Sequence, residues 1–415
     1  MRLKNLFLII VPLITIYILF YTGYVHKLLV PVHPTPYGEA YLSTNLFRDW
    51  IITFREIECY KFLVGCIGGE GAFPYGPIMF YVPFSGEIYS LVYYKILPPV
   101  LAAAFIICIF KLIKPKDVKN YLFFLLIIFT PTTMLAIERM NIDLPILLIA
   151  VFICYSHYSW LNFLLIGFCF LTKYYPAVFF VNFFVEKKYR SKTKTILLCT
   201  LCLLLSFTFI LFRYDIISQA AEVMGESQAG FHLLFSVKGI SKFLKYIFNF
   251  NYIFLLVITY LSFIFLTKKF YMMLKINNVF KKLDIYNFED KLFIIGINTL
   301  IINYLIFSNY YYREIFLILG LPLLLKLKPL NNTIINFMIR FIIARYIFLF
   351  FYNFIVLGDT FFYIDGVRTF YNTFISIFAI KNVLDFIVMS FLSSFLFFYN
   401  SNIIEKILGF SFIKK

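Results

Sequence analysis

The chain has 415 residues, of which 62% are hydrophobic and 14% are charged. Because soluble proteins carry about a quarter charged residues, this composition excludes an ordinary soluble domain and indicates a polytopic membrane protein. The net charge of +17 requires no nucleic-acid partner, because the basic residues gather on one side of the predicted spans, which is the positive-inside bias.

Apolar runs between charged breaks predict about twelve transmembrane helices. The first run has no small-residue cleavage site, so we expect a retained span and not a removed signal peptide. Two short runs, 160–172 and 174–186, are typical of tilted or broken helices around a cavity. The predicted spans are 6–25, 91–112, 120–137, 143–157, 160–172, 174–186, 195–213, 251–267, 292–308, 314–326, 334–356 and 372–399. We therefore expect an all-α integral membrane protein, with one domain over residues 1–415.

The basic segments indicate the orientation of these spans. With the N-terminus in the cytoplasm, alternation places 111–119, 186–194 and 268–282 inside, together with the C-terminus. The two largest outer segments are then 26–90 and 214–250. We expect a protein of the inner (plasma) membrane with both termini cytoplasmic and the lipid bilayer as its surroundings. A few charged residues fall inside the spans, namely Lys95, Arg340, Arg345, Lys381 and Asp385.

Reporter fusions test this orientation. Fusions within 114–119, 187–194 and 276–290, and at the C-terminus, should report the cytoplasm, because the charge distribution over the whole chain places these segments inside. Fusions within 30–70 and 220–245 should report the outer side. Alkaline phosphatase is active only outside the cytoplasm, so activity of a fusion at residue 190 would contradict the orientation.

The first outer segment contains LFRDWIITFREIECYKF (46–62), in which charged and apolar residues are interleaved. Two interpretations stay open, a helix lying in the membrane interface or a cavity-facing catalytic carboxylate at Asp49. The following stretch, GGEGAFPYGPIMFYVPF (68–84), is too rich in Gly and Pro for a plain span and favours a re-entrant or interfacial segment. Cys59 and Cys66 leave two alternatives open, a disulfide in an oxidising compartment or two free thiols.

More polar residues lie at the outer ends of later spans. They occur in IERMNID (137–143), FLTKYYP (170–176) and SNYYYREIFL (308–317). Because the two spans between the first two stretches form a hairpin, we expect Lys173 to return to the side of Asp143. Each cation alone could be a snorkelling helix-end residue. Together they favour a shared polar site, since ionisable groups at membrane depth cost a few kcal/mol unless they are paired or used.

This candidate site combines the groups needed to deprotonate a hydroxyl and to hold a leaving phosphate. The candidates are the carboxylates Asp49, Glu138 and Asp143, the cations Arg139, Lys173 and Arg313, the amide Asn141, and the tyrosines Tyr174 and Tyr312. The sequence has no Gly-rich nucleotide loop, and its four histidines lack the spacing of metal ligands. We therefore expect neither a cofactor nor a metal.

Several motifs occur in an order that resembles a known family. They are FRDW (47–50), IECYK (57–61), FPYGPIMFYVPF (73–84), ERMNIDL (138–144), LTKYYP (171–176) and YREIFL (312–317). The order resembles bacterial multispanning glycosyltransferases of the C-type fold, above all the polyprenol-phosphate-mannose-dependent mannosyltransferases. The chain is also similar to O-antigen-modifying glucosyltransferases. The resemblance covers roughly residues 45–190 and 305–325, and Met140 stands where the family has glycine.

The resemblance implies a C-type architecture with an active site at the outer face. The implied reaction transfers a sugar from a polyprenyl-phosphate donor to a surface glycan or a lipid-linked acceptor such as O antigen. Asp49 would be the catalytic base. The phosphate would be held by Arg139, Lys173 and Arg313, while Glu138, Asn141, Asp143, Tyr174 and Tyr312 would bind substrate or orient the cations.

Two other functions stay open. An O-antigen or polysaccharide polymerase also uses polyprenyl-linked sugars at the outer face, and the lysines of segment 214–250 would suit its pyrophosphate-linked donor. A lipid-linked sugar flippase or transporter should carry polar breaks at mid-membrane in two related halves, and the sequence shows no internal repeat. The residues do not specify the sugar, the acceptor or the linkage.

Overall fold

The computed structural model describes residues 3–22, 96–156, 158–173, 175–181, 192–212, 235–284, 287–306, 311–330, 332–361 and 367–408. Within these ranges all regular structure is helical, with no strand, which confirms the all-α class. The α-helices are α1 (Leu3–Thr22), α6 (Leu97–Ile113), α7 (Val118–Ile128), α8 (Pro131–Arg139), α9 (Asp143–Tyr155), α10 (Ser159–Thr172), α12 (Lys192–Phe212), α14 (Val237–Phe248), α15 (Tyr252–Ile276), α16 (Phe288–Ile306), α17 (Leu321–Leu327), α18 (Thr333–Phe361) and α19 (Val367–Leu408). The 3-10 helices are η2 (Tyr175–Phe180), η4 (Val279–Lys282), η5 (Tyr311–Gly320) and η6 (Lys328–Leu330).

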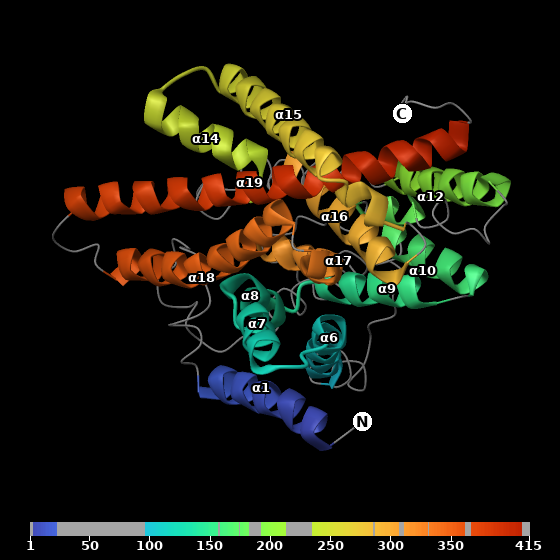
Figure 1. The fold of residues 1–415 in the computed structure, drawn as a ribbon, viewed down its shortest axis with the longest axis horizontal. Coiled ribbons are helices and arrows are strands. Elements are labelled where there is room, and N and C mark those ends of the chain that lie inside the picture. The colour runs from blue at the N-terminus through green and yellow to red at the C-terminus, as the bar shows by residue number, and fades with distance from the viewer. Residues whose placement is uncertain are drawn as a thin grey trace.

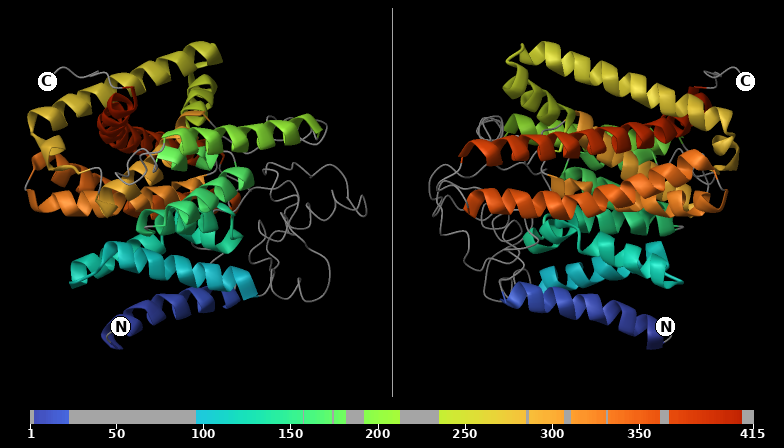
Figure 2. Two further views of the ribbon diagram at one scale, coloured as in Figure 1. Left: turned by 90° about the vertical axis from the view of Figure 1, so that its right-hand side faces the viewer. Right: turned by 60° about the vertical axis from the view of Figure 1, so that its left-hand side comes forward.

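The helices are stacked in layers. In Figures 1 and 2, α1 and α6 lie at one end of the stack, α9 and α18 lie in the middle, and α19 and α15 lie towards the other end. One buried hydrophobic cluster joins these layers, from Ile9 in α1 to Ile403 in α19. The N-terminal and C-terminal helices are therefore parts of the same packed core.

Three of the described helices are long and apolar enough to cross a membrane. They are Tyr252–Ile276, Thr333–Phe350 within α18, and Ser376–Ile403 within α19. A fourth span results if the bent pair Val118–Ile128 and Pro131–Glu138 is counted as one. Shorter apolar helices are Leu8–Ile18, Leu97–Ile113, Asp143–Tyr155 and Trp160–Thr172. These findings support a helical membrane protein, whereas the count of about twelve spans remains a prediction from the sequence.

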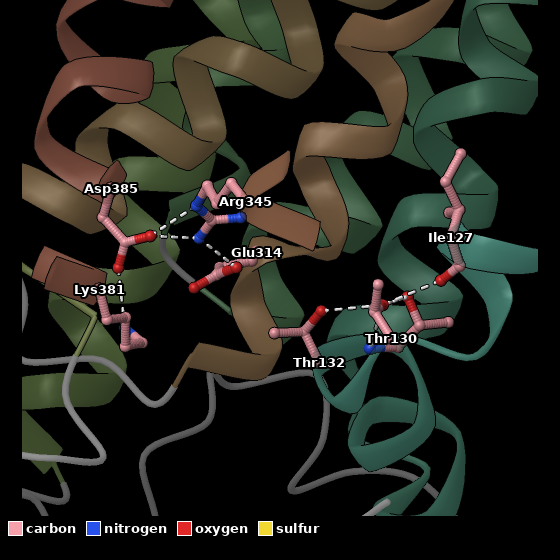
Figure 3. Close-up of polar contacts among 8 residues, drawn as sticks. Ile127, Thr130, Thr132, Glu314, Arg345, Lys381 and Asp385 are labelled. Atoms are coloured by element: carbon pink, nitrogen blue, oxygen red, sulfur yellow. Dashed lines mark hydrogen bonds and ion pairs between the residues drawn. The ribbon is translucent and has the colours of Figure 1, made fainter. Parts of the chain in front are cut away.

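The span predicted at 120–137 is broken into two helices. The axes of α7 and α8 differ by 53°. Pro131 disfavours helical geometry at Thr130, and Thr130 has extended angles (φ −60°, ψ 146°) and caps α8. Its hydroxyl donates to the carbonyl of Ile127 at 2.9 Å and accepts from the backbone N–H of Thr133 at 3.4 Å. The buried break is therefore satisfied by its own threonines (Figure 3).

Helix α16 and the 3-10 helix η5 approach each other closely at two glycines. A Cβ atom added at Gly296 would lie 2.3 Å from the Cβ of Leu319, and one added at Gly320 would lie 2.7 Å from Cδ1 of Ile297. Any larger residue at Gly296 would have to push η5 away. The glycines thus fix the distance between α16 and η5, which carries Arg313.

Candidate functional site

The candidate site is built around Asp143, which is the first residue of α9 and is fully buried. Nζ of Lys173 lies 2.5 Å from Asp143 Oδ1, and the hydroxyl of Tyr175 donates to the same oxygen at 2.6 Å. Nε of Arg313 lies 3.3 Å from Asp143 Oδ2. We call Asn141, Asp143, Lys173, Tyr175 and Arg313 the Asp143 cluster. Three separate stretches of the chain meet there.

Local helix ends favour the charges of this cluster. The carboxylate of Asp143 sits at the N-terminus of α9, and Lys173 is the residue that caps the C-terminus of α10. Both charges have the sign that complements the helix dipole at those ends. The predicted proximity of Lys173 and Asp143, inferred from the hairpin between them, is confirmed.

The turn between α8 and α9 depends on Met140. This residue has a left-handed backbone conformation (φ 46°, ψ 47°), which glycine adopts at lower cost than methionine. The turn lets Asn141 accept the backbone N–H of Asp143 and Nζ of Lys173 on one oxygen, both at 3.2 Å. Asn141 thus helps to position Asp143 and Lys173 relative to each other.

Arg313 forms the open edge of the cluster. Its side chain is 21% exposed, against 7% for Lys173 and 0% for Asp143. Its Nη1 donates to Oδ1 of Asn303 at 3.1 Å, and its guanidinium lies 5.7 Å from the ring centre of Tyr175. The contact with Asp143 is an ion pair without hydrogen-bond geometry, so Asp143 Oδ2 retains hydrogen-bonding capacity. Within the cluster, Lys173 and Arg313 both contact the carboxylate of Asp143.

The structure does not place all the predicted residues. Asp49, Cys59, Cys66 and Tyr174 lie outside the described residues, so the prediction of a base at Asp49 and the two alternatives for the cysteines stay open. The backbones of Arg139 and Tyr312 lie in α8 and η5, but their side chains are not described. Glu138 is buried in α8.

Two residues of the site were not selected from the sequence. Tyr175 directly follows the candidate Tyr174, and its place before Pro176 was the available signal. Asn303 is a buried amide within the otherwise apolar end of α16. Its side-chain N–H donates to the carbonyl of Thr299 at 2.8 Å, so its oxygen is turned towards Arg313. A buried polar residue in a predicted span is the feature that could have identified it.

A second charged group lies deeper in the helices, and we call it the Arg345 network (Figure 3). Nη2 of Arg345 donates to Glu314 Oε2 at 2.6 Å, and its Nε donates to Asp385 Oδ1 at 2.6 Å. Nζ of Lys381 donates to the other oxygen of Asp385 at 2.7 Å. All four side chains are buried. Two cations and two carboxylates balance, which reduces the cost of placing charges among apolar helices.

Comparisons with protein-family models, with curated proteins and with solved structures found no match to this chain. Among the described residues, no group of three or more His, Cys, Asp and Glu side chains could hold a metal ion. The fold and the site together define a helical membrane protein with the Asp143 cluster at its helix ends and the Arg345 network among its helices.

Proposed function

We propose that the protein is a membrane glycosyltransferase. It transfers a sugar from a polyprenyl-phosphate donor to a surface glycan or lipid-linked acceptor, such as O antigen, at the outer face of the inner membrane. The observation that supports this most is the Asp143 cluster, in which a buried carboxylate contacts both Lys173 and Arg313, and Arg313 lies at a partly exposed edge.

This arrangement suits a phosphate monoester or diester at the membrane surface. Asp143 contacts both cations and fixes their positions, so the site is organised before the ligand arrives. Arg313 can present a guanidinium to two phosphate oxygens, because its planar fork matches that geometry. The apolar surroundings strengthen each charge interaction relative to water. Asp143 Oδ2 can accept a further hydrogen bond, for which a sugar hydroxyl is the fitting donor.

The proposal also includes the number of spans and the orientation of the protein in the membrane. We place about twelve spans in one C-type domain, with segments 26–90 and 214–250 outside and both termini in the cytoplasm. The Asp143 cluster then lies at the outer ends of its helices, where a polyprenyl phosphate anchored in the outer leaflet would reach it.

The reaction needs one base and one group that stabilises the leaving phosphate. The acceptor hydroxyl gives its proton to Asp49 and attacks the anomeric carbon, whose bond to the phosphate oxygen breaks. The polyprenyl phosphate departs with the bonding electron pair and is stabilised by Lys173, Arg313 and Arg139. A single displacement of this kind inverts the anomeric centre. The donor is already activated, so the proposal includes no cofactor and no metal.

A transfer assay with the purified protein tests the proposal. The protein is incubated with a synthetic polyprenyl-phosphate sugar and a set of lipid-linked and glycan acceptors, and new glycosidic products are identified by mass spectrometry. Donor consumption with a new glycosidic bond supports the proposal. Movement of the donor between leaflets without any new bond would replace it with a flippase.

A polymerase is the second candidate, and α14 is the feature that favours it. This helix belongs to the predicted second outer segment, and it carries Lys238, Lys242 and Lys245, of which the last two are exposed. Such a basic face could bind a pyrophosphate-linked oligosaccharide. Deletion of the gene followed by gel analysis of lipopolysaccharide separates the two. Loss of the long-chain ladder indicates a polymerase, and a retained ladder with altered sugar content indicates a side-chain glycosyltransferase.

A further inference from the structure

Two consecutive residues of η5 connect the two charged groups. Arg313 contacts Asp143 in the Asp143 cluster, and Glu314 contacts Arg345 in the Arg345 network. In a 3-10 helix, with three residues per turn, neighbouring side chains point roughly 120° apart, whereas residues three apart share a face. Phe316 accordingly lies on the face of Arg313 and packs edge-on against Tyr175, with 5.9 Å between ring centres. The direction of Arg313 is therefore tied to the rotation of η5.

Helix η5 needs contacts from elsewhere to keep that rotation. It contains ten residues, whereas 3-10 helices longer than about 3–4 residues are uncommon because their hydrogen bonds have poorer geometry. The close approach at Gly296 fixes how near η5 lies to α16. Apolar packing of this kind sets a distance but gives little directional control. Arg313 has directional contacts of its own with Asp143 and Asn303, so a directional contact at another residue of η5 is needed to set the rotation independently of them.

The Arg345 network supplies that contact. Arg345 is only 1% exposed, and its rigid guanidinium contacts Asp385 through both Nε and Nη2 while Nη2 also donates to Glu314. Lys381 holds the second oxygen of Asp385, so the carboxylate that aligns Arg345 is itself aligned. In Figure 3 the side chain of Arg345 bridges Asp385 and Glu314. Helices α18 and α19 thereby clamp η5 at the residue that follows Arg313.

We infer that Glu314, Arg345 and Asp385 are positioning residues that set the rotation of η5 and so aim Arg313 at the Asp143 cluster. The consequence for catalysis rests on the proposed function, but the positioning of Arg313 does not. The competing explanation is that the network only stabilises the packing of three helices. The two explanations differ in whether the effects of substituting Arg345 and Arg313 on stability are coupled.

Arg345→Lys is the variant that separates them. Lysine keeps the positive charge but has one compact ammonium in place of a planar fork, so it cannot reproduce both contacts in the same geometry. A misplacement of about 1 Å at a positioned site can cost about 100-fold in rate. We expect Arg345→Lys to lower kcat for transfer at least about tenfold while the protein remains folded. Glu314→Gln keeps an acceptor for Arg345 and should lose less activity than Glu314→Ala.

Two control variants make this comparison specific. Arg340→Lys is the same exchange on the same helix, but Arg340 is exposed, and transfer should be unchanged. Asp290→Asn alters another buried carboxylate, which accepts from the hydroxyl of Tyr399 at 2.5 Å and pairs with Lys326 at 3.4 Å. It should lower thermal stability without lowering kcat of the folded protein.

A thermal cycle tests positioning without any activity. The shift in unfolding midpoint caused by Arg313→Ala is measured in the unchanged protein, in Arg345→Lys and in Asp290→Asn. If Arg345 aims Arg313 at Asp143, the shift should be smaller in Arg345→Lys than in the other two backgrounds. If Arg345→Lys does not fold, Glu314→Gln takes its place in the cycle.

The outcomes separate this inference from the proposed function. Equal shifts in all three backgrounds, or full transfer activity in Arg345→Lys, would overturn the inference. If the shifts are unequal but no glycosidic bond is formed, the positioning of Arg313 by Arg345 stands and the proposed reaction is wrong.

Discussion

Lys173→Met is expected to lower the rate of sugar transfer by about 10²- to 10³-fold, the size of effect seen when one preorganised group that stabilises developing negative charge is removed. Lys173 has the shortest contact with Asp143, at 2.5 Å, and only 7% of its side chain is exposed. The same substitution leaves a buried carboxylate short of one partner, which costs about 3–5 kcal/mol in comparable buried pairs. Transfer rate and thermal unfolding must therefore be measured together.

A double variant separates the two effects. Asp143→Asn combined with Lys173→Met removes both charges, so the stability lost in Lys173→Met should largely return. Transfer should not return, because the cation is still missing. Lys326→Ala is the matched control. Like Lys173, Lys326 pairs with a buried carboxylate, Asp290, at 3.4 Å, and it also pairs with Glu289 at 3.7 Å. Its loss should therefore lower stability but leave transfer unchanged. Recovery of transfer in the double variant would assign Lys173 a purely structural role.

The other cations of the proposed phosphate site should follow the same pattern. Arg139→Ala and Arg313→Ala are each expected to lose most transfer activity while the protein still inserts into the membrane. Arg313 is partly exposed, so its removal should cost less stability than removal of Lys173. Removing a residue that only snorkels to the membrane surface would cost little activity. Near-normal rates in Arg139→Ala, Arg313→Ala and Lys173→Met would therefore show that these cations only snorkel.

Asp49→Asn is expected to abolish transfer while donor binding survives. Asparagine keeps the size and hydrogen bonding of aspartate but lacks the basic oxygen that receives the acceptor proton. Asp49→Glu should recover little, because one added methylene moves the carboxylate by about 1 Å, enough to cost about 100-fold at a positioned site. Kinetics with the synthetic donor, together with donor-binding measurements, check both expectations.

The neighbouring acids provide the comparison for Asp49. Glu56 and Glu58 share the first outer segment and should tolerate exchange to glutamine better. If Asp49→Asn keeps its activity and Glu58→Gln loses it, Asp49 is the wrong carboxylate, although the class of reaction stands.

Pairing across one hairpin could be predicted from the sequence. Asp143 and Lys173 are separated by two apolar runs joined by a short break, so alternation across the membrane returns them to the same side. The contact between them confirms this reasoning. Arg313 was expected on the same side for the same reason, and it contacts Asp143. Topology was sufficient for these residues because each lies at the end of an apolar run.

The Arg345 network could not be assembled in this way. Arg345, Lys381 and Asp385 were recognised as charges inside spans, but their partners depend on how each helix is rotated. Helices α18 and α19 are apolar on nearly all sides, so the sequence pattern indicates no preferred inward face. Glu314 lies next to Arg313 in sequence, yet it points to the other group because consecutive residues of a helix point about 100–120° apart.

Breaks within two of the predicted spans could not be predicted from the apolar pattern. The span 120–137 is predicted as one helix because the whole run is apolar. The Thr-Pro pair within it is a helix-start signal, and the structure has a bend there between α7 and α8. The predicted span 314–326 covers most of η5 and then α17, which begins at Leu321. Apolar composition predicts burial in both stretches, but it does not distinguish an α-helix from a 3-10 helix.

The central claim is that the Asp143 cluster binds the phosphate of a lipid donor, and a binding measurement tests it most directly. The affinities of a short-chain polyprenyl phosphate and of the uncharged polyprenol of equal length are measured with the purified protein and with Arg313→Ala. A charge-assisted hydrogen bond contributes about 1.5–3 kcal/mol. The account therefore predicts that the phosphate lipid binds at least about tenfold more tightly, and that Arg313→Ala removes most of this preference. Equal affinities for the two lipids in the unchanged protein would contradict it.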